Sequence, residues 1–242
     1  MGWKSCYFIA AENDCPHGYL GTLPKHNSER ATELFSKLGY KTTNRRKSPI
    51  IDFPQDNQVY LGAYDKAVIV SDQAIYDCFE DQNHPLLKNA LSIHPDGTLM
   101  VIVLHSVVNL FGYAFYRNGQ LIRQYGGCGD DGVTHEHGEL LDEERDAFAK
   151  SKVINGERFF LSEYDGVVEE VTPDCYGETL VFAVLERYYG EILDQSEHLW
   201  PEDLQGEAID NHNDFAPDEL HKRLTQPESE KSEIPWWKRI FK

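Results

Sequence analysis

The dipeptide Asn118-Gly119 constrains the fold of this chain more than any other feature of its sequence. It separates two apolar runs, 111–116 and 121–125, and both of its residues tolerate the positive φ angles that a two-residue hairpin turn requires. Such a short turn also fixes which residues of the two strands face each other. The sequence therefore predicts a β-hairpin in which Tyr116 faces Leu121, Phe115 faces Ile122 and Ala114 faces Arg123.

The run 99–104 precedes this hairpin and predicts a strand in the middle of a sheet. All six of its residues are apolar and three of them, Val101, Ile102 and Val103, are β-branched, which is typical of a strand covered on both faces. A Pro-Asp-Gly turn at 95–97 leads into it. Shorter runs rich in apolar residues predict further strands at 4–11, 58–63, 66–71, 158–161 and 167–171.

Two segments have the apolar spacing of helices that pack on a sheet. In the first, 28–39, apolar residues recur at helical spacing, Asn27 or Ser28 can cap the start, and Gly39 supplies the stop. The second, 173–189, follows a capping threonine and opens on a proline. Weaker signals predict a helix capped by Ser71 that runs towards residue 79, and another at 85–91. We expect the basic segment 41–47 to be a loop, and the acidic segment 129–146 to be a loop or a short helix.

These elements together predict an α+β fold with a mainly antiparallel sheet centred on residues 98–126. Residues 1–200 are expected to form a single domain, because the last predicted helix ends near Gly190. From 201 to 233 Asp, Glu, Asn and Pro dominate, which predicts an acidic flexible linker. The last segment, 234–242, is then an aromatic and basic terminal peptide.

The charge and the cysteines of the chain limit its ligands and its location. The 242 residues carry a formal net charge of −18 with a pI near 4.9, so the chain repels phosphate backbones, and nucleic acid is not an expected ligand. The five cysteines are odd in number and form no Cys-x-x-Cys pair, which favours reduced thiols and a cytoplasmic location. We recognise neither a signal peptide nor a transmembrane segment.

Most of the side chains that could carry chemistry follow the hairpin. They are His105 at the end of the central strand, and Cys128, Asp130, Asp131, His135, Glu136 and His137 in the segment 128–137. Imidazole, thiolate and carboxylate ligands suit zinc, and His135 and His137 are the candidate ligands. Their spacing matches no known metal signature, so we expect no bound metal and no cofactor.

Catalytic roles for His105, Cys128, Asp130 and Asp131 have little support from the sequence. His105 and Ser106 are adjacent, and adjacent strand residues point to opposite faces, so they cannot form a dyad in a regular strand. A hydrogen-bonded structural histidine is the simpler interpretation. Cys128 lies between glycines, which predicts an exposed thiol, but no neighbouring cation is evident to lower its pKa.

The terminal peptide combines large apolar side chains with cations. Its candidate binding residues are Trp236, Trp237, Arg239, Ile240 and Phe241. Aromatic and arginine side chains are common binding anchors, and a helix of about two turns is too short to hold a membrane alone. Three alternatives remain open: the peptide folds back onto its own domain, binds an unknown partner protein, or touches a membrane surface transiently.

Three stretches resemble a known group of sequences. The run VLHSVVNLFGYAFYRNGQLIR, the DDGV after it and the upstream VYLGAYDKAVIVSDQAIYDCF are similar to an uncharacterised bacterial domain family of unknown function. The resemblance covers residues 4–144 and implies a bacterial, cytosolic protein. It assigns no activity, so no functional residue can be carried over, and WWKRIFK lies outside it.

Two classes of function remain at this point. The first is a non-catalytic binding or interaction protein, which the charge, the missing catalytic motif and the terminal peptide favour. The second is a small-molecule or metal-dependent enzyme that uses His105 and the 128–137 loop. A pocket that joins His105 to this loop would favour the enzyme.

Overall fold

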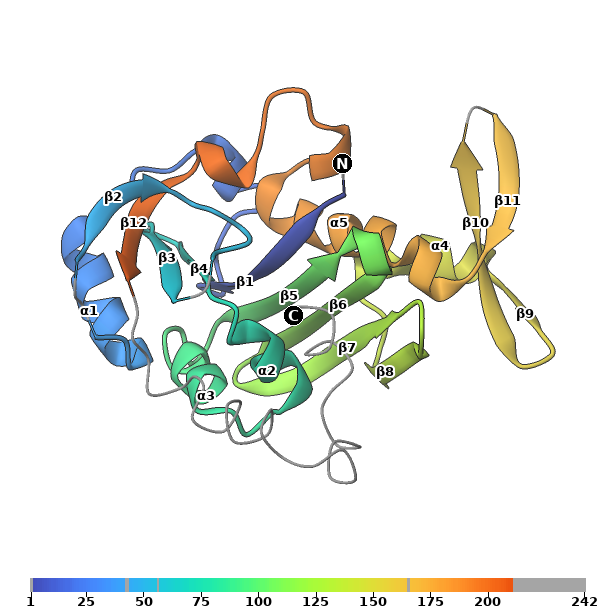
Figure 1. The fold of residues 1–242 in the computed structure, drawn as a ribbon, viewed down its shortest axis with the longest axis horizontal. Coiled ribbons are helices and arrows are strands. Elements are labelled where there is room, and N and C mark those ends of the chain that lie inside the picture. Colours follow the sequence, from blue (N-terminus) through green and yellow to red (C-terminus); the bar gives the residue numbers. More distant parts are fainter. Residues whose placement is uncertain (1, 42–43, 56, 165, 211–242) are drawn as a thin grey trace. The chain divides into compact units, whose positions relative to one another are not determined.

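The computed structural model describes residues 2–41, 44–55, 57–164 and 166–210. Its main element is a nine-stranded antiparallel sheet in the order β2-β12-β3-β4-β1-β5-β6-β7-β8 (Figure 1). The strands are β1 (Lys4–Ala11), β2 (Arg46–Pro49), β3 (Gln58–Ala63), β4 (Ala67–Ser71), β5 (Thr98–His105), β6 (Leu110–Arg117), β7 (Gln120–Cys128), β8 (Gly132–Gly138) and β12 (Gln205–Asp210). The predicted α+β class and the antiparallel sheet are confirmed. The sheet is not centred on residues 98–126, because β5 to β7 are the sixth to eighth strands and β1 lies in the middle.

Helices cover both faces of this sheet. The helices in the described residues are α1 (Ser28–Leu38), α2 (Ile75–Glu80), α3 (Pro85–Leu91), α4 (Asp142–Lys150) and α5 (Pro173–Tyr189). Two successive residues of β6 contact different helices. Gly112 lies under the Phe79 ring of α2, whereas the Phe111 ring lies against Gly177 of α5. Because adjacent strand residues point to opposite faces, α2 and α5 pack on opposite sides of the sheet.

Gly177 determines how closely α5 approaches β6. A Cβ atom at this position would lie 2.1 Å from Cγ of Phe111, a distance that packed atoms do not reach. The absent side chain lets the Phe111 ring sit directly on the helix backbone. Large side chains of the core, among them Tyr113, Phe115, Leu180 and Val184, are fully buried between the two elements.

The two longest predicted helices are confirmed, together with most of their end signals. The side chain of Asn27 accepts hydrogen bonds from the N–H groups of Glu29 and Arg30 at 3.0 Å, which caps α1. Gly39 and Gly190 end α1 and α5 with left-handed φ angles of 91° and 80°. Thr172 occupies the position before α5 but makes no capping hydrogen bond with its side chain.

The hairpin of β6 and β7 has the predicted turn but only part of the predicted register. Asn118 and Gly119 both have positive φ angles, 51° and 72°, and Tyr116 faces Leu121 as expected. A β-bulge then shifts the register, so that Phe115 faces Arg123 instead of Ile122, and Ala114 faces Gln124. The prediction was wrong beyond Tyr116, because a turn fixes register only until an extra residue enters one strand.

Three segments expected to be loop or linker are part of the fold. Residues 129–146 form β8 and the first half of α4. The basic segment 41–47 enters β2 at Arg46, and β2 pairs with β12, where Arg46 binds Asp210 at 2.7 Å. Residues 201–210 do not belong to a linker, because β12 lies between β2 and β3 with Ala208 and Ile209 fully buried. The division of the rest of the chain into domain, linker and terminal peptide stays a prediction.

The helix for which Ser71 is the predicted cap begins later than expected. Ser71 is the last residue of β4, and α2 starts at Ile75. The carboxylate of Asp72 instead accepts the N–H of Ala74 at 2.9 Å and the hydroxyl of Tyr40 at 2.7 Å. Residue 72 thus stabilises the turn that leads into the helix, a role that the sequence assigned to its neighbour.

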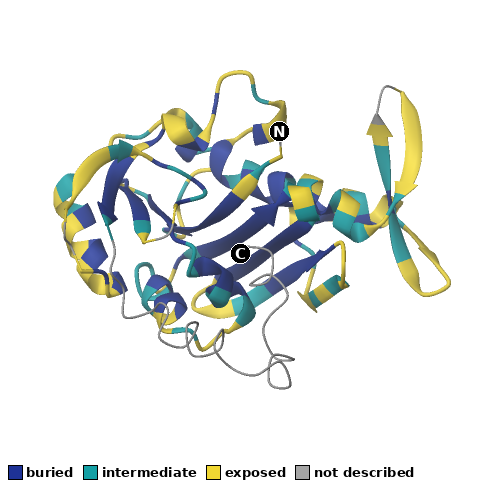
Figure 2. Ribbon diagram, in the orientation of Figure 1, coloured by how far each residue is buried: buried dark blue, intermediate teal, exposed yellow. Residues whose placement is uncertain are grey.

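A second sheet of three strands joins α4 to α5. It consists of β9 (Lys152–Ile154), β10 (Glu157–Tyr164) and β11 (Val167–Val171), with β10 in the middle. β9 pairs with the first residues of β10 and β11 with the last. We call residues 152–171 the paired hairpins. They stand apart from the large sheet. Most of their residues are exposed or partly exposed, whereas most residues of the large sheet are buried (Figure 2).

Candidate functional site

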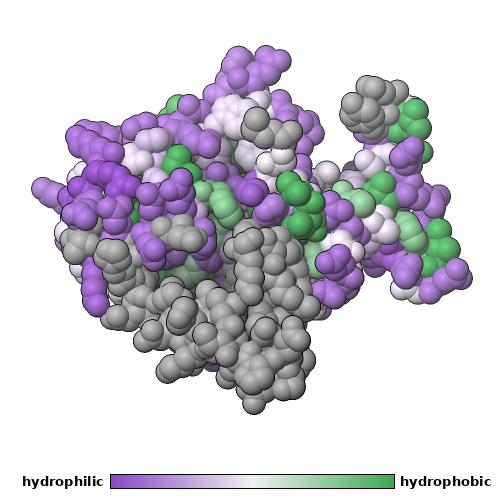
Figure 3. Space-filling model, in the orientation of Figure 1, coloured by the Kyte–Doolittle hydropathy of each residue, from purple (hydrophilic) through white to green (hydrophobic). Residues whose placement is uncertain are grey.

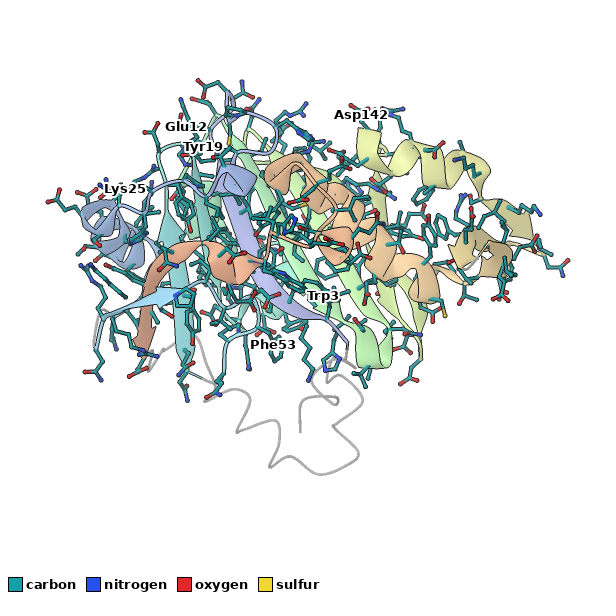
Figure 4. All side chains as sticks on the ribbon, turned by 90° about the horizontal axis from the view of Figure 1, so that it is seen from above. Trp3, Glu12, Tyr19, Lys25, Phe53 and Asp142 are labelled. Carbon is teal, nitrogen blue, oxygen red and sulfur yellow. The ribbon has the colours of Figure 1, made fainter. Side chains whose placement is uncertain are left out.

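His105, the first predicted site residue, lies at the end of β5 in a closed environment. It is buried, and its ring meets that of Phe53, labelled in Figure 4, edge to face at a centroid distance of 6.4 Å. Burial and the nearby Lys4 ammonium group lower the pKa of His105. A neutral, packed imidazole fits the structural interpretation better than the catalytic one.

Cys128 is not the exposed thiol that the sequence predicts. It is the last residue of β7, it is buried, and burial raises its pKa. Its sulfur lies 3.9 Å from Oδ2 of Asp131, a weak contact. Strand β6 lies between β5 and β7, so two strand spacings, about 10 Å in total, separate the backbones at His105 and Cys128. The two side chains therefore do not form a nucleophile and base pair.

The remaining predicted ligands lie on β8 and in the turn between β7 and β8. Asp130, Asp131 and His137 are exposed. His135 lies on β8 and not in a loop, with Nε2 3.7 Å from the Glu80 carboxylate, and burial lowers its pKa. Within the described part of the chain, no three His, Cys, Asp or Glu side chains are grouped as a metal site requires.

The five candidate binding residues of the terminal peptide lie outside the described residues. Trp236, Trp237, Arg239, Ile240 and Phe241 belong to the segment 211–242. Their role as a docking peptide stays a prediction.

A buried ion pair that the sequence did not predict joins β7 to α4. Arg123 and Glu144 are 1% and 0% exposed, and the guanidinium donates to both carboxylate oxygens, with the shortest contact 2.8 Å. Glu144 also accepts the hydroxyl of Tyr113 at 2.5 Å and the N–H of Leu141 at 2.8 Å. All of its oxygens are thus occupied, which suits a structural role and leaves no free carboxylate for chemistry.

This ion pair begins a column of rings that anchors the paired hairpins. The Arg123 guanidinium lies over the rings of Tyr125 and Phe148. Phe148 of α4 contacts Phe160 of β10 edge to face at 5.2 Å, and Phe160 stacks on Tyr176 of α5 at 4.7 Å. Because Phe160 is fully buried, the middle strand of the hairpins is fixed at its centre to both helices.

The hairpins themselves expose apolar side chains. Of the seven large apolar residues that are exposed in the described part of the chain, four lie here: Val153, Ile154, Val167 and Val168, at 61%, 42%, 57% and 57%. Figure 3 shows hydrophobic surface on both hairpins. The sequence predicted strands at these positions, but strand patterns do not show which apolar residues lack a covering element.

A small cavity lies where β5 and β6 meet the first turns of α5. Its volume is about 180 Å³, and its polar lining includes Ser106, Asn109, Asp174 and Glu178. These groups bind one another: Asn109 donates to Asp174 at 3.2 Å, and Ser106 donates to Glu178. The lining residues include none of the predicted site residues. The cavity therefore does not join His105 to the 128–137 segment.

Comparison with known proteins identifies the family of the chain. Residues 6–155 match the model of a family of unknown function, DUF6928. The chain belongs to DUF6928. The match confirms the resemblance to an uncharacterised family, whereas a bacterial source stays a prediction. The DUF6928 match ends within the first of the paired hairpins, before β10, β11 and α5.

No curated protein and no solved structure matches the chain. In the described residues, no helix is long and apolar enough to cross a membrane.

Proposed function

We propose that this DUF6928 protein is a non-catalytic binding protein that contacts another protein through its paired hairpins. The concentration of exposed Val153, Ile154, Val167 and Val168 in one short segment carries the proposal. Scattered apolar residues are normal on a surface, but a concentration of them in one element marks an interaction site. Ile154 and Val168 lie on one face of the hairpins and Val153 and Val167 on the other. Each such side chain contributes about 1.5–3 kcal/mol when it is fully buried, so covering either face would supply useful binding energy.

The anchoring of the hairpins supports the same proposal. A surface binds better when it is held in shape before the partner arrives, because less conformational entropy is lost. The contacts of Phe160 with Phe148 and Tyr176 hold the centre of β10. The alternative, an enzyme that uses His105 and the 128–137 segment, finds less support, because strand β6 separates His105 from Cys128 and the two side chains are buried apart.

The test compares a pair of exposed valines in the hairpins with one exposed valine outside them, each replaced by threonine. We expect Val167→Thr/Val168→Thr, which keeps β-branched residues in β11, to reduce capture of a partner from an extract of the source cells at least tenfold. Val107→Thr is the control, because Val107 is 72% exposed on a turn of the main domain. If both variants and the wild type capture the same proteins in equal amounts, the proposed function is wrong.

The terminal peptide is a separate proposed contact. If Trp236 and its neighbours dock on a partner, removal of 234–242 should leave the melting temperature nearly unchanged and reduce capture of that partner. A drop in the free energy of unfolding by a few kcal/mol would instead indicate burial on the chain's own domain, because each buried large aromatic contributes roughly 1.5–3 kcal/mol.

A further inference from the structure

The paired hairpins have two faces with different surroundings. Residues of β10 alternate between them, and Phe160, which packs on α4 and α5, identifies the inner face. The other face takes Glu157, Phe159, Leu161 and Glu163 from β10. Residues that pair across strands share a face, so Ile154 joins Glu157, Lys152 joins Phe159, Glu170 joins Leu161, and Val168 joins Glu163.

We call these eight residues the outer face. Its four apolar members, Ile154, Phe159, Leu161 and Val168, run diagonally across the three strands. Ile154 and Val168 at the ends are exposed, and Phe159 and Leu161 between them are partly exposed. A continuous apolar strip of this kind, with no covering element among the described residues, is a surface that a partner can bury.

The charges around the strip all favour a basic partner. Glu157 and Glu163 stand near its two ends, and neither has an ion-pair partner within the described residues. The single cation of the outer face, Lys152, is already bound to Glu170 at 2.5 Å. Arg158 belongs to the inner face, where it donates to Ser151 and lies over the Phe148 ring. The uncompensated charge of the outer face is therefore negative.

The negative charge also argues against other occupants. A second copy of the chain would bring the same glutamates to the interface in a molecule of net charge −18, and like charges that face each other cost energy. Anionic lipid surfaces are disfavoured for the same reason. Glu157 and Glu163 are six residue steps apart along β10, which corresponds to about 20 Å.

We infer that the outer face binds a protein segment whose large apolar side chains are flanked, over about 20 Å, by lysine or arginine. The apolar residues of such a segment would cover the strip, and its two cations would reach Glu157 and Glu163. This inference rests on the proposed function and adds the chemistry of the partner.

A labelled peptide tests the inference directly with the full-length protein. The probe is Lys-Trp-Val-Thr-Val-Trp-Lys, whose length in extended form matches the distance between the two glutamates, and its control carries glutamate at both ends. Fluorescence anisotropy should detect binding of the lysine-ended probe and at least tenfold weaker binding of the control. Binding should also weaken as salt is raised.

Charge reversal locates the site. We expect Glu157→Lys/Glu163→Lys to weaken the lysine-ended probe at least tenfold, and Glu29→Lys/Glu33→Lys, which makes the same charge change on the exposed face of α1, to weaken it less than twofold. Equal weakening by both pairs, equal binding of both peptides, or no binding to the wild type would overturn the inference. If the partner captured from extract is lost in Val167→Thr/Val168→Thr but kept in Glu157→Lys/Glu163→Lys, the proposed function stands and the basic partner does not.

Discussion

We expect the substitution Glu144→Leu to remove a large part of the stability of this protein. Leucine has a similar volume but accepts no hydrogen bond. Arg123 is 1% exposed. Of the acceptors that its guanidinium now has, only the carbonyl oxygen of His137, 3.4 Å away, would remain. Tyr113 and the N–H of Leu141 would lose their acceptor as well.

The size of the effect follows from these losses. Removal of one member of a buried ion pair costs about 3–5 kcal/mol, because the other charge stays buried without its partner. Loss of the hydrogen bond that Glu144 makes to the start of α4 adds about 1 kcal/mol. We therefore expect a loss of about 4 kcal/mol or more, which for a domain of this size corresponds to a melting temperature about 8–16 °C lower.

Urea unfolding followed by circular dichroism measures this loss, and two further variants make the result specific. Arg145→Met removes an exposed ion pair of the same helix, Arg145 with Asp142, and should cost less than about 1 kcal/mol. Arg123→Met/Glu144→Leu replaces both buried charges and should recover most of the stability. If Glu144→Leu costs no more than Arg145→Met, or if the double variant is as unstable as Glu144→Leu alone, the reasoning is refuted.

Three further substitutions test separate features by the same unfolding measurements. Gly177→Ala should destabilise the protein by about 1–3 kcal/mol, because its methyl group overlaps the Phe111 ring. Gly119→Val should cost roughly 1 kcal/mol or more, since a β-branched residue is strained at a φ of 72°. Burial raises the pKa of Asp52 to about 6, above the unfolded value near 3.9. The protonated form of Asp52 therefore stabilises the fold fully below about pH 4, and this stabilisation is lost as the pH rises through about 6. When the pH is lowered from 7 to 4, the free energy of unfolding of the wild type should increase by about 2–3 kcal/mol relative to that of Asp52→Asn.

Each of these substitutions has an outcome that would contradict it. A more stable Gly177→Ala would mean that the gain in helix propensity outweighs the overlap with Phe111. Gly119→Asn is the control for the turn, because asparagine tolerates the left-handed region, and equal losses in both variants would contradict the conformational explanation. An unchanged difference between the wild type and Asp52→Asn across this pH range would contradict the raised pKa.

The sequence alone determined the elements whose signals are local. The turn at Asn118-Gly119 depends on two residues that accept positive φ, and the boundaries of α1 on a capping asparagine and a final glycine. The run 99–104 has no polar residue to place at a surface, and its short length and three β-branched residues favour a buried strand. In each case the residues that interact are only a few positions apart in the sequence, so local sequence patterns are enough to predict the element.

The tertiary structure decided everything that depends on a distant partner. β12 is a strand because β2 and β3 lie on either side of it, and its own sequence, QGEAID, has only two apolar side chains, which is too weak a pattern to predict that. Arg123 and Glu144 are 21 residues apart and form a pair only after β7 and α4 have packed. The same reason explains why Cys128 is buried and Val167 and Val168 are exposed, although all three lie in segments rich in apolar or small residues. Neighbouring elements cover Cys128, whereas no element among the described residues covers the two valines.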